Sequence, residues 1–103
     1  MLFHQLLGAV RACGPVTVLS EKTRIAFHRR MSFIAVSIKR DCLRGHFVLA
    51  ERLEHPRFLR IDTISPHNHV HQFRLSSSSE INGEFKQWIR QAYAVGQQMH
   101  IQR

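Results

Sequence analysis

The sequence predicts an α+β protein, in which an antiparallel β-meander of five or six strands carries an N-terminal and a C-terminal helix on one face as a two-layer sandwich. Two observations indicate this fold class. Apolar residues recur at the helical period near both ends of the chain, whereas the residues between them alternate between apolar and polar side chains. Short polar turns join the alternating segments, and sequential strands joined in that way pair antiparallel.

The first predicted element is a helix over residues 1–13. Its apolar face comprises Leu2, Phe3, Leu6, Leu7, Val10 and Cys13. Gly14 and Pro15 follow this stripe. That order is typical of a helix end, because glycine readily adopts a left-handed backbone and proline cannot continue a helix.

Six segments are predicted as strands, at residues 16–19, 24–28, 32–39, 43–49, 58–64 and 66–75. The segment 32–39 is apolar on both faces, which is typical of a central strand. Gly45 interrupts the next segment opposite bulky neighbours, and a glycine there indicates a bulge or a close approach of two backbones.

The last predicted element is a helix over residues 77–98. Ser77 and Glu80 have the spacing of a capping box. The apolar stripe comprises Ile81, Phe85, Trp88, Ile89, Ala92, Val95 and Met99. The expected core comprises Leu6, Val10, Ile25, Phe27, Ile34, Val36, Phe47, Ile61, Phe73, Leu75, Phe85, Trp88 and Ile89.

Length and composition favour one domain, spanning residues 1–103. No run of about 18 apolar residues is present, so no membrane span is expected. The chain also begins without the pattern of a signal peptide, and its two cysteines, Cys13 and Cys42, make no disulfide framework. These features favour a cytoplasmic protein with reduced thiols.

Four segments in succession resemble a known family. They are EKTRIAF at 21–27, MSFIAV at 31–36, the Ser65–Pro66 break with the histidine-rich strand after it, and FKQWIRQAY at 85–93. In this order they resemble the bacterial family catalogued as domain of unknown function 5655 (DUF5655), over nearly the whole chain. The resemblance supports the α+β fold and implies no catalytic residues. Family members usually carry a little more sequence before the first helix, so the resemblance implies a chain trimmed at its N-terminus.

The formal net charge is +8, which favours a nucleic acid or another polyanion as partner. If Arg24 and Arg60 lie on an open sheet face, they could join turn residues in a basic stripe that contacts phosphates rather than reads bases. The candidate residues are Arg24, Arg29, Arg30, Lys39, Arg40, Arg44 and Arg60. An arginine-rich composition without a binding role would produce the same charge.

A second candidate site is the strand at 66–75. Side chains alternate along a strand, so His67, His69 and His71 are expected to share a face with the core residues Phe73 and Leu75. Buried imidazoles need partners, because an unpaired buried polar group costs about 1–3 kcal/mol.

Three interpretations of these histidines stay open. They could be hydrogen-bonded structural residues, they could line a small-molecule pocket together with Lys22, or His69 and His71 could hold a metal ion such as zinc. The metal interpretation has the least support, because the alternating spacing is not specific and no Cys-x-x-Cys motif is present.

No pattern typical of a catalytic triad, a phosphate-binding loop or a dinucleotide-binding loop appears. The sequence therefore favours a non-enzymatic binding module with a basic surface and without a cofactor. The alternatives are the small-molecule pocket of Lys22 and the strand histidines, and an accessory domain that self-associates or joins a larger protein. No membrane partner is expected.

Overall fold

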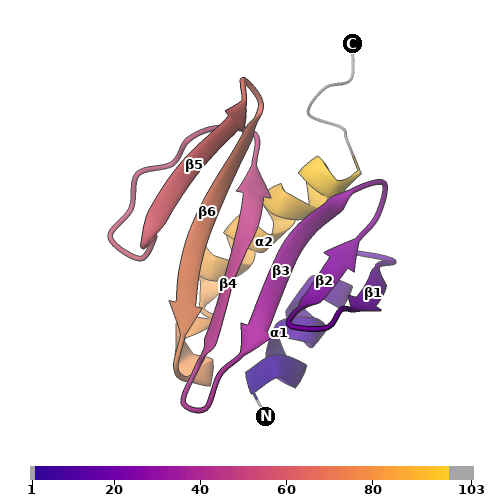
Figure 1. The fold of residues 1–103 in the computed structure, drawn as a ribbon, viewed down its shortest axis with the longest axis vertical. Helices are drawn as coiled ribbons and strands as arrows, with labels where there is room; N and C mark the ends of the chain where they lie inside the picture. The colour runs from indigo at the N-terminus through magenta and orange to yellow at the C-terminus, as the bar shows by residue number, and fades with distance from the viewer. Residues whose placement is uncertain (1, 98–103) are drawn as a thin grey trace.

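The computed structural model describes residues 2–97 and shows an α+β arrangement of two helices and a six-stranded sheet (Figure 1). A short 3-10 helix, η1, precedes the second α-helix. In chain order the elements are α1 (Leu2–Arg11), β1 (Thr17–Ser20), β2 (Ile25–His28), β3 (Ser32–Ile38), β4 (Leu43–Leu49), β5 (Arg60–Ser65), β6 (Asn68–Leu75), η1 (Ser78–Glu80) and α2 (Gly83–Gly96). This order confirms the predicted fold class.

All neighbouring strands pair antiparallel, in the order β1-β2-β3-β4-β6-β5. The sheet is a sequential meander as far as β4. Residues 50–59 then carry the chain past the position of β6 to the sheet edge, and Figure 1 shows this connection running along the outer side of β5. β5 therefore lies at the sheet edge, and β6, which follows it in the sequence, lies between β5 and β4.

Within residues 2–97 both α-helices lie on one face of the sheet and none lies on the other (Figure 1). We call the uncovered side the open face. Along β4, Phe47 and Leu49 point into the core beneath the helices, whereas Arg44 and His46 alternate onto the open face.

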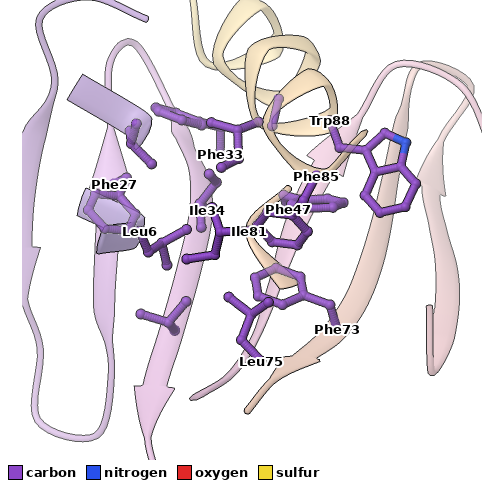
Figure 2. Packing of buried hydrophobic residues seen from close by; sticks show 14 of the residues in the cluster. Leu6, Phe27, Phe33, Ile34, Phe47, Phe73, Leu75, Ile81, Phe85 and Trp88 are labelled. Carbon is purple, nitrogen blue, oxygen red and sulfur yellow. The ribbon is translucent and has the colours of Figure 1, made fainter. Parts of the chain in front are cut away.

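The core is dominated by aromatic rings that pack between the sheet and α2 (Figure 2). The Phe47 ring centroid lies 4.9 Å from that of Phe73 and 5.7 Å from that of Phe85. Trp88 covers the side of this cluster nearest β5 and β6. Every predicted core residue is buried except Ile25 and Ile61, which pack against the cluster while partly exposed.

The start of the C-terminal helix differs from the prediction. The Glu80 carboxylate accepts hydrogen bonds from the backbone N–H groups of Ser76 and Ser77, but these residues begin only the short η1. The chain then re-enters a helix after Asn82, whose side-chain oxygen accepts from the Phe85 N–H at 2.9 Å. The predicted stripe residue Met99 and the predicted helix end lie outside the described residues.

The end of α1 is fixed against α2. Gly14 has a φ of +144°, as its position after the helix predicted. Tyr93 of α2 donates its hydroxyl hydrogen to the Pro15 carbonyl at 2.6 Å, and a Cβ on Gly14 would lie 2.7 Å from that hydroxyl oxygen. Glycine thus gives the chain both the conformation and the space that this contact needs.

Within residues 2–97 neither α-helix has the length and apolar character needed to cross a membrane. Cys13 and Cys42 are both partly buried and unpaired, so they form no disulfide.

Candidate functional site

The predicted basic residues divide between the two ends of the strands. Arg29 and Arg30 lie in the β2–β3 turn, where the Arg30 N–H donates to the carbonyl of Gly96 at 2.9 Å. Lys39 and Arg40 lie in the β3–β4 turn, at the opposite end of β3. The structure therefore does not bring all seven candidates into one stripe.

One pair of arginines stands out on the open face. Arg44 on β4 lies directly opposite Arg74 on β6 in the strand register. Their neighbours in sequence, Leu43 and Leu75, form the adjacent pair and point into the core, so both arginine side chains project from the open face and are exposed. Arg74 was missed in the sequence, although its alternation with Phe73 and Leu75 placed it on the polar side of the strand.

A polar depression of about 430 Å³ adjoins this pair. It is lined by Ser37, Lys39, Arg44, Gly45, His46 and Gln72. Lys39 therefore contributes a third positive charge, and no acidic side chain lines the depression. Burial, followed by the charge of Arg24, lowers the pKa of His46 below its ordinary value, so this imidazole is neutral at neutral pH. We call Lys39, Arg44, His46 and Arg74 the basic patch.

Two other candidates on this side are paired with carboxylates. The Arg24 Nε lies 2.6 Å from a Glu21 carboxylate oxygen, and the Arg60 Nε lies 2.9 Å from a carboxylate oxygen of Asp62. Within residues 2–97 no such ion pair involves Arg44 or Arg74. Arg24 and Arg60 are thus less available to an anionic partner than the arginines of the basic patch.

Arg40 lies beside a different hollow, a groove of about 270 Å³ between the start of α1 and the β3–β4 turn. Apolar side chains of Phe3 and Ile38 line part of this groove together with Arg40 and Asp41. Lys39 lines both hollows, whereas Arg40 lines only this groove and is therefore not part of the basic patch.

The histidines of the predicted second site have separate environments. His71 is fully buried, and its Nδ1–H donates to the His69 carbonyl at 2.8 Å while its Nε2 accepts from the Leu53 N–H at 3.0 Å. Both ring nitrogens thus make hydrogen bonds, and burial is the largest cause that lowers the pKa of His71 below its ordinary value. This is the geometry of a neutral, hydrogen-bonded structural histidine.

The neighbouring histidines do not complete a pocket with His71. The ring nitrogens of His69 lie 2.9 Å from the Thr63 hydroxyl and 3.2 Å from the Pro66 carbonyl. His67 lies exposed in the β5–β6 turn, because β6 begins one residue later, so it does not share the core face as predicted. In the part of the chain that the structure describes, no group of three or more His, Cys, Asp or Glu residues could hold a metal ion.

Lys22 lies exposed in the turn between β1 and β2. Strands β3 and β4 separate β2 from β6 in the sheet order. Adjacent strands are spaced by about 4.8 Å, so the structure does not bring Lys22 together with His69 and His71.

The fold and the site define a class: a small, single-sheet α+β domain with helices on one face and a basic patch on the other. A family model described as domain of unknown function (DUF5655) matches residues 1–96, and the chain belongs to that family, as the resemblance in sequence predicted. Searches of curated proteins and of solved structures returned no match.

Proposed function

We propose that this protein is a binding module whose basic patch contacts the phosphates of a polyanion, with nucleic acid as the expected partner. The observation that carries the proposal is the direct cross-strand pairing of Arg44 with Arg74 on the open face. Like charges directly opposite each other destabilise a sheet. A bound anion would offset that repulsion.

The chemistry of the patch suits phosphate. Guanidinium groups bind phosphate oxygens through two parallel hydrogen bonds, and the ammonium group of Lys39 adds a point charge. The depression beside Arg44 gives room for a phosphate group near both types of cation. The open face is one side of a six-stranded sheet, so a partner can extend across several strands.

The aromatic residues argue against base stacking as the mode of contact. Every Phe, Trp and Tyr in residues 2–97 is buried except Phe3, which packs partly exposed against the core. Proteins that bind single strands by stacking present such rings on their surface. Binding through the basic patch is therefore expected to depend on phosphates, with little preference for sequence.

Fluorescence anisotropy with labelled single-stranded and duplex DNA and RNA tests the proposal. Counterion release predicts that affinity falls steeply between roughly 50 and 200 mM salt. The double variant Arg44→Gln/Arg74→Gln is expected to bind at least about tenfold more weakly and to lose about 0.9 from the salt slope for each phosphate contact removed.

The matched control is Arg29→Gln/Arg30→Gln, which removes the same charge from the turn at the other end of the sheet. It should retain most of the affinity. Equal losses in the two double variants would show that net charge alone drives binding, and an absence of binding at the lower salt concentration would reject the proposal.

A further inference from the structure

The connection between β4 and β5 is held by two imidazoles that act as hydrogen-bond acceptors. The first is His71, whose Nε2 accepts from the backbone N–H of Leu53 at 3.0 Å. Its other nitrogen donates to the His69 carbonyl, so the acceptor nitrogen carries no proton. The bond ties residue 53 of the connection to the buried side of β6.

The second acceptor is His55, within the connection itself. Its Nδ1 accepts from the Arg57 N–H at 3.1 Å, and its Nε2 lies 3.3 Å from a Glu84 carboxylate oxygen at the start of α2. The proton of the neutral ring therefore lies on Nε2. In this state His55 both shapes the turn at residues 55–57 and attaches it to α2.

The two histidines meet in one aromatic cluster. The Phe58 ring centroid lies 4.8 Å from that of His71 and 4.7 Å from that of Trp88, and the His55 ring lies 4.8 Å from Trp88. The Arg57 guanidinium stacks over Phe85 at 5.0 Å. Residues 53–58 therefore cover the apolar rings at the side of the core.

We infer that His71 forms a proton-sensitive clasp, which holds the connection at Leu53 against the core when its ring is neutral and releases it when the ring is protonated. A protonated imidazole carries hydrogen on both nitrogens. The His71 ring would then present an N–H to the Leu53 N–H, which leaves two donors without an acceptor.

The surrounding charges define the direction of the response. Arg52 and His69 oppose protonation of His71, whereas Glu54 favours it. The adjacent strands contribute Phe47 and Ile61 opposite His71, which carry no charge.

Burial lowers the pKa of His71 in the folded protein from the ordinary value of 6.5. The released form therefore takes up a proton first as the pH falls below that value, so acid favours release and the closed form is fully favoured above it.

Backbone amide hydrogen exchange, followed by NMR between about pH 7.5 and pH 5, tests this inference. After correction for intrinsic exchange, protection of the Leu53 amide should fall by about tenfold per pH unit below the ordinary histidine pKa, as linkage to one proton requires. The Phe85 amide, which donates to Asn82 rather than to a histidine, should keep its protection.

One substitution supplies an acceptor that does not titrate. In His71→Gln the amide oxygen can replace Nε2 as the acceptor of the Leu53 N–H. This variant should make the protection of the Leu53 amide independent of pH. His67→Gln, in the exposed β5–β6 turn, is the matched control and should respond like the wild type.

The wild-type profile alone decides the inference if a variant fails to fold. Constant protection of Leu53 across the pH range would overturn it. A parallel loss at Leu53 and Phe85 would also overturn it, because that result describes unfolding of the whole protein. As a second readout, acrylamide quenching of Trp88, the only tryptophan, should increase on the acid side without loss of the helical circular dichroism signal.

Discussion

Neighbouring residues of the β4–β6 pair show how position on the sheet determines the role of a histidine. His71 lies opposite Phe47 on the core side, and His46 lies opposite Gln72 on the open face. Burial lowers the pKa of both rings, but only His71 has both nitrogens in hydrogen bonds with backbone groups. The first histidine stabilises a loop, and the second leaves a neutral polar group among the arginines of the basic patch.

Trp88 is the residue whose loss should destabilise the core most clearly. Its ring is 4% exposed and packs against Phe58, Phe85 and His55. Trp88→Ala is expected to lower the free energy of unfolding by about 3–5 kcal/mol, because it removes a large buried ring and leaves a cavity.

Urea denaturation at neutral pH measures this loss. Lys86→Ala, on the exposed side of the same helix, should change the free energy of unfolding by less than about 0.5 kcal/mol. A loss of under about 1 kcal/mol for Trp88→Ala would contradict the placement of this ring between α2 and the connection from β4 to β5.

The candidate site was only partly predictable from single residues. Arg44 was predicted as a turn residue of a basic stripe, but it lies within β4, and its pairing with Arg74 depends on which strand lies beside β4. The acceptor role of His71 depends on the backbone of Leu53, which lies outside any strand. Neither relation leaves a local pattern in the sequence, because each joins residues from segments distant along the chain.

At the scale of elements, α2 packs against the sheet through contacts of a glycine and of aromatic rings. Gly96 is buried against Phe33 of β3, and a Cβ added to it would lie 2.8 Å from the Phe33 Cγ. Strict alternation would place Phe33 on the face opposite Ile34 and Val36. A register shift between Phe27 and His28 in the pairing of β2 with β3 accompanies its turn toward the helix, where its ring meets Tyr93 edge-on at 5.4 Å.

The same substitution at the two ends of α2 should have opposite effects. Gly96→Ala is expected to lower the free energy of unfolding by about 1–3 kcal/mol, because the added methyl group collides with the Phe33 ring. The Cβ added by Gly83→Ala would meet no neighbouring side chain or strand within 4 Å. This variant should raise the free energy of unfolding by up to about 1 kcal/mol, because alanine has a greater helix propensity than glycine.

Thermal unfolding of the two variants beside the wild type gives the comparison. If Gly96→Ala proved as stable as Gly83→Ala, the close packing of α2 on β3 would be wrong. The far-ultraviolet circular dichroism of both variants should match that of the wild type before heating.

The elements themselves follow closely from periodicity and turn residues. Both helices and all six strands lie where alternation and helical spacing predicted them, with shifts at the ends. The exchange of β5 and β6 in the sheet order could not be predicted, because β5 and β6 each have the pattern of a paired strand and the sequence does not state their neighbours. The start of α2 at Gly83 was likewise not predicted, because the sequence offers two helix N-caps. One is Ser77 with Glu80, which begins η1, and the other is Asn82, which begins α2.

For the whole molecule, the positive charge is a source of instability as well as of binding. The formal net charge is +8, and two of these charges face each other across β4 and β6. Self-repulsion of this kind destabilises the compact state and is screened by salt, over a Debye length of about 10 Å at 0.1 M.

The double variant Arg44→Gln/Arg74→Gln is therefore expected to be more stable than the wild type at low salt, by roughly 0.2–1 kcal/mol. The difference should shrink as salt is added. Chemical denaturation in urea, which adds no ions, measures it. The control Arg29→Gln/Arg30→Gln, with exposed neighbouring turn residues, should gain less, and equal gains would indicate a general charge effect rather than a strained pair.

Because β6 lies between β4 and β5, the sheet consists of two parts in which strands adjacent in the sequence pair with each other. Strands β1–β4 form a meander of short-range hairpins, and β5 with β6 forms a second hairpin. The β4–β6 pairing is the long-range step that joins them, and such pairings limit the rate of folding. Arg44 and Arg74 lie on opposite sides of that boundary, so the basic patch is complete only after the slow step, and a nascent chain that ends before residue 66 carries Lys39, Arg44 and His46 but lacks Arg74.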